Sequence, residues 1–138
     1  MENIDRRSAL ALLGCVAATF AAARPAAADA MDSGSKDTTP FPGVVQRSYG
    51  STPSLIPAYK TVSMRDLIMQ PGSKTAPNAA MKNDMVCHVT QGELRLIQND
   101  QTFTAKTGYV WTCAKGTIEQ AFNDGTVVGI MRITDLLA

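Results

Sequence analysis

The chain has 138 residues, of which 45% are hydrophobic and 18% charged, with 13 Lys and Arg against 12 Asp and Glu. The near balance of charge gives no long-range positive field for nucleic acid, and the hydrophobic content is that of a globular protein and not of a disordered one. After the first thirty residues, the sequence is long enough for one compact core and too short for a second domain, and no later stretch approaches the ~20 apolar residues of a membrane span.

Residues 1–30 are predicted to be a signal peptide. A charged start with Arg6 and Arg7 precedes an apolar run from Ala9 to Ala23, and Ala28-Asp29-Ala30 follows as a small-residue cleavage site. The paired arginines and the Ala-rich and Leu-rich run resemble a twin-arginine signal. The alternative is a general secretory signal whose start happens to contain two arginines. Either form predicts a periplasmic or secreted bacterial protein.

A lipid anchor is a third interpretation of the same segment. Residues 12–15, Leu-Leu-Gly-Cys, resemble a lipobox, which would place a lipidated Cys15 at the mature N-terminus. Only a short apolar run precedes Cys15, whereas the hydrophobic part of a signal usually has about 7–15 residues.

Residues 31–57 are expected to be a flexible N-terminal segment with one possible edge strand, and residues 58–138 are expected to form the folded barrel. Met31 to Gly43 is rich in Ser, Thr, Gly, Asp and Pro, a composition typical of an exposed tether. Val44 to Ser48 could form a short edge strand. Pro53 and Pro57 predict an irregular connection, because proline cannot donate a hydrogen bond to a central strand.

From Lys60 onward the sequence predicts a series of short strands. Their expected ranges are 60–69, 85–90, 93–98, 102–105, 109–113, 118–123 and 126–134, separated by turns that contain Gly, Asn or Asp. A hairpin is expected at Asn99-Asp100-Gln101. Close, even spacing without a helical period favours an all-β barrel or sandwich.

Gly72 to Gly92 carries a family resemblance. The spacing of Gly72, Asn78, Ala80, Met85 and Gly92 equals that of the glycine, the two histidines, the glutamate and the second glycine in the first signature of the cupins. The resemblance implies an all-β cupin fold, that is, a double-stranded β-helix or jelly-roll barrel. It also implies that the side chain of residue 85 points inward, so that Cys87 shares its face and His88 faces outward.

A second stretch resembles the second cupin signature. Gly108, Gly116 and Asn123 match its glycines and asparagine, while Ala114 stands for its proline and Glu119 for its histidine. The two signatures together cover about residues 60–133 and are specific for the fold more than for any activity.

The resemblance implies a metal centre whose usual ligands are absent here. The matching positions offer an amide at Asn78, nothing at Ala80, a thioether at Met85 and one carboxylate at Glu119, and His88 is the only histidine of the chain. We therefore expect no conventional histidine-ligated metal.

Cys87 and Cys113 leave three alternatives open. They could create a soft thiolate site for copper(I) or zinc with the help of Met85, they could be linked by a disulfide, or they could simply fill the core. Glu119 is the candidate catalytic residue, because a carboxyl group that lines the barrel without a metal could act as a general acid or base.

The expected function is binding of a small apolar or carbohydrate-like molecule inside the barrel. Its candidate ligand-binding residues are Asn78, Met85, Cys87, Trp111, Cys113, Phe122 and Asn123. The first alternative is a cupin-type enzyme, either a metal-dependent oxygenase or isomerase with atypical ligands or an acid–base catalyst using Glu119. The second is a structural or interaction protein that pairs through its sheets with His88 at the seam. A homodimer is expected, with no nucleic-acid partner.

Overall fold

The structure is a computed structural model that describes residues 34–138. The export segment expected over residues 1–30 lies outside this range. The described residues form ten strands and no helix, so no helix among them could cross a membrane. The strands are β1 (Lys36–Phe41), β2 (Val44–Pro53), β3 (Thr61–Met69), β4 (Ala79–Ala80), β5 (Asp84–Gln91), β6 (Glu93–Gln98), β7 (Gln101–Lys106), β8 (Val110–Cys113), β9 (Ile118–Phe122) and β10 (Gly129–Leu137).

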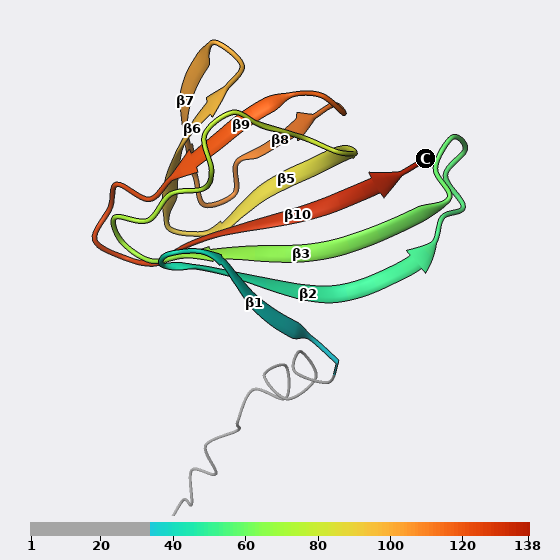
Figure 1. Cartoon of the computed structure of the whole chain (residues 1–138), viewed down its shortest axis with the longest axis horizontal. Helices are drawn as coiled ribbons and strands as arrows, with labels where there is room; N and C mark the ends of the chain where they lie inside the picture. Colours follow the sequence, from blue (N-terminus) through green and yellow to red (C-terminus); the bar gives the residue numbers. More distant parts are fainter. Residues whose placement is uncertain (1–33) are drawn as a thin grey trace, which may run out of the picture.

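The strands make two sheets that face each other. One has six strands in the order β1-β2-β3-β10-β5-β8, and the other has four in the order β4-β9-β6-β7. Every pairing is antiparallel, and Figure 1 shows the long β2, β3 and β10 side by side with β6, β7 and β9 across from them. The expected all-β jelly-roll architecture is therefore confirmed.

The N-terminal part differs from the expected tether. Residues 36–41 form the edge strand β1, which is almost fully exposed, and β2 extends from Val44 to Pro53 as the second strand of the sheet. An ion pair between Arg47 and Asp37, with Nε to Oδ1 at 2.9 Å, links the two strands. Polar composition did not reveal β1 because an exposed edge strand buries almost no apolar surface.

The predicted strands from residue 60 to 122 match the structure closely. The hairpin between β6 and β7 turns through Asn99, whose φ is +51°. The last strand begins later than expected and runs to Leu137, because it pairs with β3 along its whole length and not only with its neighbour β5. Met85, Cys87 and Val89 are buried and His88 is half-buried, as the alternation predicted.

Gly92 explains why a signature glycine is required between β5 and β6. Its φ is +72°, and a Cβ atom built there would lie 2.7 Å from the backbone oxygen of Val128. Gly72 also has a positive φ, +78°, but open space surrounds the position of its missing side chain. The first glycine thus serves the turn alone, whereas the second also permits a close backbone approach.

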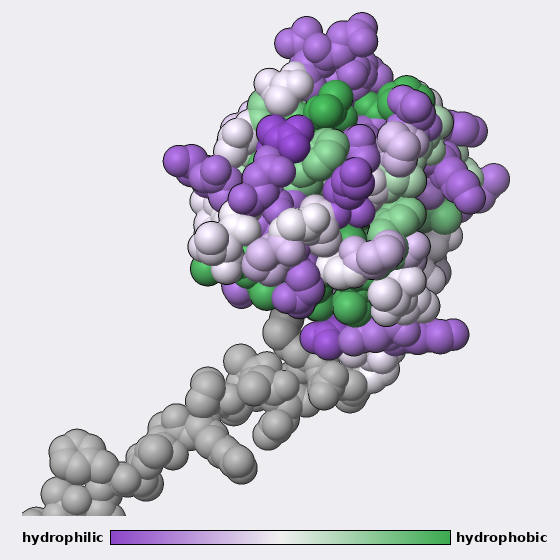
Figure 2. Space-filling view, turned by 60° about the vertical axis from the view of Figure 1, so that its left-hand side comes forward, coloured by the Kyte–Doolittle hydropathy of each residue, from purple (hydrophilic) through white to green (hydrophobic). Residues whose placement is uncertain are grey.

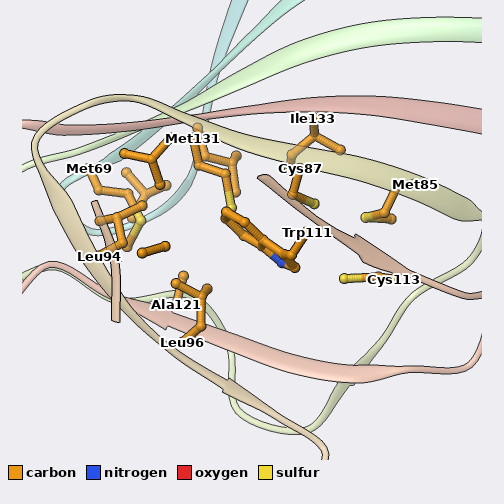
Figure 3. Close-up of a cluster of buried hydrophobic side chains, with 14 residues drawn as sticks. Met69, Met85, Cys87, Leu94, Leu96, Trp111, Cys113, Ala121, Met131 and Ile133 are labelled. Carbon is orange, nitrogen blue, oxygen red and sulfur yellow. The ribbon is translucent and has the colours of Figure 1, made fainter. Parts of the chain in front are cut away.

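The two ends of the barrel interior differ. The tightly packed region around Val44, Met69, Leu94 and Asn123 is referred to as the closed end. There, Asn123 Nδ2 donates hydrogen bonds to the carbonyl oxygens of Met69 and Val127. In Figure 3, Met69 and Leu94 lie at one side of the cluster and Met85 and Cys113 at the other.

The outer surface is mixed in polarity. On the face in Figure 2, hydrophobic residues form several separate areas among hydrophilic ones. The barrel interior is thus the main apolar compartment of the described chain, and its less tightly packed end holds the candidate site.

Candidate functional site

Both sheets contribute to the polar cluster at the other end of the interior. This end is referred to as the open end, and it is defined by five buried residues, Met85, Cys87, Trp111, Cys113 and Glu119. Cys87 pairs across strands with Trp111, and Met85 pairs with Cys113, so these four side chains occupy adjacent positions on the inner face of β5 and β8. Glu119 reaches the same place from β9 of the opposite sheet.

Hydrogen bonds hold one oxygen of the Glu119 carboxyl group. Its Oε2 atom accepts from Trp111 Nε1 at 3.0 Å and from Cys113 Sγ at 3.2 Å. Gln98 Nε2, which comes from β6, donates to Cys113 Sγ at 3.1 Å. The side chains of this cluster are therefore fixed by donors from two strands, β6 and β8, and by the Glu119 carboxyl group of a third, β9.

The second oxygen of Glu119, Oε1, is not held by the surrounding side chains. Oε1 has no hydrogen-bond partner among the described residues, and none of their buried side-chain oxygens lacks a partner, so Oε1 is accessible. Because Glu119 also lines the cavity, this oxygen is the one a bound molecule would meet.

Burial changes the ionisation of this cluster. Removal from water raises the pKa of Glu119, and the hydrogen bonds from Trp111 and Cys113 only partly oppose this effect. The pKa of Cys87 is raised strongly, first by its hydrogen bond with Cys113, then by burial and by the charges of Cys113 and Glu119, while Arg65 acts in the opposite direction. Burial thus favours the neutral forms of both groups, compared with the same groups in water.

The cavity has a volume of about 390 Å³. Its walls are mainly aliphatic and thioether side chains, among them Leu67, Met81, Met131 and Ile133, with Arg65 and Lys82 as the cationic groups. The volume falls within the range of about 300–1,000 Å³ typical of small-molecule sites. The predicted apolar pocket therefore has a counterpart in the structure.

Arg65 is neutralised by a carboxylate within the barrel. Its Nε atom lies 2.8 Å from Asp135 Oδ2, its Nη2 atom donates to Asp135 Oδ1 at 3.3 Å, and its Nη1 atom donates to Gln46 Oε1 at 3.2 Å. The half-buried guanidinium of Arg65 is therefore paired with an opposite charge.

The structure brings together only part of the predicted ligand-binding set. Met85 and Glu119 line the cavity, and Cys87, Trp111 and Cys113 lie directly behind them. Asn78 is exposed, occupies a turn with φ of +54°, and does not line the cavity.

Phe122 and Asn123 do not line the cavity either. Phe122 lies on the outer face of β9, where the Arg95 guanidinium stacks 3.9 Å from its ring centre. Asn123 belongs to the closed end, where its side chain bonds only to backbone groups. Strand alternation could have placed Phe122 outside, because Glu119 and Ala121 face inward.

Arg65 and Gln98 are the residues of the site that sequence reasoning missed. Arg65 alternates with Leu67 and Met69 on β3, so the inward phase of that strand was a usable signal. Gln98 ends β6 and lies opposite Glu119 in the strand pairing, a relation that no sequence pattern reveals.

An imidazole-ligated metal does not fit this site. The two histidine-equivalent positions, Asn78 and Ala80, are exposed, and His88 lies on the outer side of β5. Cys87 and Cys113 are free thiols in the structure. Together with Glu119 they form a group whose ligand atoms lie within 4.8 Å of one another.

Comparisons with known proteins identify the fold. No protein-family model matches the sequence, and no curated protein matches it. Among solved structures, the chain is similar to an RmlC-like cupin from Shewanella frigidimarina (TM-score 0.60, 12% identity, 78% of this chain and 87% of that one).

It is also similar to a cupin 2 conserved barrel domain protein from Salinispora arenicola (TM-score 0.58, 13% identity, 72% and 81% covered). A third neighbour is a sugar phosphate isomerase of the cupin superfamily from Silicibacter pomeroyi (TM-score 0.57, 16% identity, 70% and 61% covered). Likeness at this identity extends to the fold alone. The chain thus has the fold of the cupins, an all-β double-stranded β-helix.

Proposed function

We propose that this chain is an exported cupin-fold protein that binds a small, largely apolar or carbohydrate-like molecule inside the barrel. The observation that carries the proposal is the cavity of about 390 Å³, lined by the buried residue Glu119, whose Oε1 atom is accessible. Export rests on the sequence of residues 1–30, and a periplasmic or secreted location follows from it.

The walls define the kind of ligand. Met81, Met85 and Met131 supply flexible thioether side chains that adapt to an apolar body. The carboxyl group of Glu119 can accept a hydrogen bond at Oε1 and, in its protonated form, can donate one there, which suits a hydroxyl or carbonyl group. One structural neighbour bears the name of a sugar phosphate isomerase, which supports including sugars among the probes.

Trp111 provides a direct readout of binding. It is the only tryptophan of the chain, and its indole nitrogen bonds to the carboxyl group that the ligand would meet. We would titrate the purified protein with cyclohexanol, hexanoic acid, glucose and mannose and record Trp111 fluorescence and the melting temperature. At least one probe should give a saturable fluorescence change and raise the melting temperature, because ligand binds only the folded state.

Two neighbouring alanines make a matched pair of variants. Ala79 lines the cavity, whereas the exposed Ala80 does not. Ala79→Leu should abolish binding of the best probe by filling the cavity, and Ala80→Leu should leave it unchanged. The proposal fails if no probe binds with a Kd below about 1 mM, a free energy of about −4 kcal/mol, or if Ala79→Leu binds as the wild type does.

Acid–base catalysis by Glu119 is the second candidate function, favoured by the accessibility of Oε1 to a bound molecule. Glu119→Gln separates it from simple binding, because the amide keeps the shape of the side chain and cannot transfer a proton in the same way. Turnover of a bound probe that is lost in Glu119→Gln while binding persists supports catalysis. Binding without turnover in either form supports the binding function.

We also propose that two copies of the chain form a homodimer through their six-stranded sheets. Met64, Val86 and Val110 are exposed apolar residues, and Val86 shares the outer face of β5 with His88. Sedimentation equilibrium should show a dimer that Val86→Lys weakens. A monomer at every concentration would contradict this pairing.

A further inference from the structure

We propose that Cys87, Cys113 and Glu119 form a binding site for a thiophilic divalent cation of the zinc class at the inner end of the cavity. The ligands would be the thiolates of Cys87 on β5 and Cys113 on β8 and the carboxylate of Glu119 on β9. Of these three residues, only Glu119 stands at a position that matches a histidine of the cupin signatures. It is independent of the small-molecule proposal, since metal binding is detected without any ligand in the cavity.

The geometry already approaches that of a metal site. The two Sγ atoms and a carboxylate oxygen lie within 4.8 Å of one another, and Cys113 Sγ is 3.2 Å from Glu119 Oε2. Zinc binds sulfur at about 2.3 Å and carboxylate oxygen at about 2.0–2.2 Å, so ligand atoms around one tetrahedral ion lie about 3.5–3.8 Å apart. Small side-chain rotations would bring the three atoms to these separations.

Charge favours a divalent ion over a monovalent one. With all three protein ligands ionised, a divalent ion leaves a net charge of −1 and a monovalent ion leaves −2. The cluster is buried, with Cys87 at 0% and Glu119 at 5% exposure, and residual charge is costly there.

Surrounding donors support the ligands. Trp111 Nε1 donates to Glu119 Oε2 and Gln98 Nε2 donates to Cys113 Sγ, as outer-shell groups orient ligands in known metal sites. Figure 3 shows the sulfur atoms of Met85, Cys87 and Cys113 turned toward a common region beside the Trp111 indole. Met85 also lines the cavity. Its thioether is a weak additional ligand, and the cavity is the path by which the ion would enter.

Binding exchanges protons for the metal ion. The two S–H bonds break and their protons pass to solvent, together with the carboxyl proton of any molecule in which Glu119 is protonated, and two metal–sulfur bonds and one metal–oxygen bond form without any change of oxidation state. Affinity should therefore rise with pH.

Cobalt(II) is the probe for this site, because thiolate ligation gives near-ultraviolet charge-transfer bands and tetrahedral geometry gives intense visible bands. We would titrate the reduced protein without oxygen in a Cys15→Ser background, so that only two thiols remain. Both sets of bands should saturate at one equivalent of cobalt and disappear when zinc displaces it.

Each ligand has a distinct expected effect. Cys87→Ser and Cys113→Ser should each remove about half of the charge-transfer intensity and weaken cobalt binding at least about tenfold, or 1.4 kcal/mol. Glu119→Gln should keep the charge-transfer bands, shift the visible bands and weaken binding. His88→Ala is the matched control and should change nothing, because His88 lies on the outer side of β5.

The proposal is overturned if the reduced wild type gives no charge-transfer band, or if the band survives both cysteine variants at full intensity. Trp111 fluorescence and the melting temperature check that each variant is folded. Should a cysteine variant fail to fold, the shift of the visible bands in Glu119→Gln decides, since a cation bound elsewhere would leave those bands unchanged.

Discussion

The closed and open ends of the barrel interior are both lined by apolar side chains, but they differ in how completely their polar side chains are hydrogen-bonded. At the closed end, the side chain of Asn123 makes three hydrogen bonds, all with backbone groups of Met69, Val127 and Gly125, and the residue is only 1% exposed. At the open end, Glu119 keeps one carboxyl oxygen for the cavity. A fully bonded buried polar group serves the fold, whereas a partly bonded one beside a cavity is available for function.

The largest effect should come from breaking the closed end. Asn123→Ala leaves the carbonyl oxygens of Met69 and Val127 and the amide of Gly125 without their partner, at about 1–3 kcal/mol for each group that stays unsatisfied. We expect a loss of about 3–5 kcal/mol in the free energy of unfolding, measured by urea denaturation. Gln101→Ala, at an exposed strand end, is the control and should cost little. A loss below 1 kcal/mol would refute a structural role for Asn123.

Two glycines with similar backbone angles allow the next comparison. Gly92 and Gly116 have φ of +72° and +89°, but only at Gly92 would a methyl group meet a backbone oxygen, that of Val128 at 2.7 Å. Gly116→Ala should cost about 1 kcal/mol from the left-handed conformation, and Gly92→Ala should cost about 2–3 kcal/mol because the backbone must also move. Equal losses in thermal unfolding would show that the Val128 contact is relaxed without cost.

The pH dependence of stability tests the open end in the metal-free protein. The folded state holds the Glu119 proton more tightly than the unfolded chain, whose carboxyl has a pKa near 4.5. The stabilisation is therefore complete below pH 4.5 and is lost as the pH rises through the raised pKa of the folded state, with a slope of at most about 1.4 kcal/mol per pH unit.

Glu119→Gln should lack this decline, because its amide does not ionise. Unfolding free energies of both proteins would be measured with a chelator present from pH 4 to pH 8, a window of about four units around the pKa values of carboxyl groups. Parallel curves for wild type and variant would contradict burial of the carboxyl as the cause of the raised pKa.

The smallest effect is expected outside the barrel. Phe122 contacts Arg95 on the outer face of β9, so Phe122→Leu should change the Kd of the best cavity probe by less than about twofold, or 0.4 kcal/mol. Ala79→Leu on the cavity wall is the comparison, measured by the same Trp111 titration. A large effect at Phe122 would place the binding site somewhere other than the cavity.

Several features of the fold could be predicted from the sequence because they depend on neighbours along the chain. Alternation placed Met85, Cys87 and Val89 on the inner face of β5, and turn residues such as Asn99 marked the hairpin between β6 and β7. Edge strand β1 was missed, because its polar residues pair with β2 without joining the core.

The candidate site could be predicted only in part. Spacing in the two signature-like stretches singled out Met85 and Glu119, which do line the cavity, and also Asn78, which does not. Asn78 occupies a turn before β4 with a positive φ, and the direction of a loop side chain is set by that local backbone angle and not by its distance from a glycine in the sequence.

The sequence by itself determined the approximate ranges of β3 and of β5 to β10, the inward phase of β5, the turns at Gly72 and Gly92, and the lack of a second imidazole. Only the tertiary structure decided that Cys87, Cys113 and Glu119 meet, and that Arg65 lies opposite Asp135 and not free in the cavity. The physical reason is the separation along the chain over which each effect acts. Alternation and turn chemistry depend on neighbouring residues, whereas the cluster forms between two sheets that are held face to face by burial of the whole core.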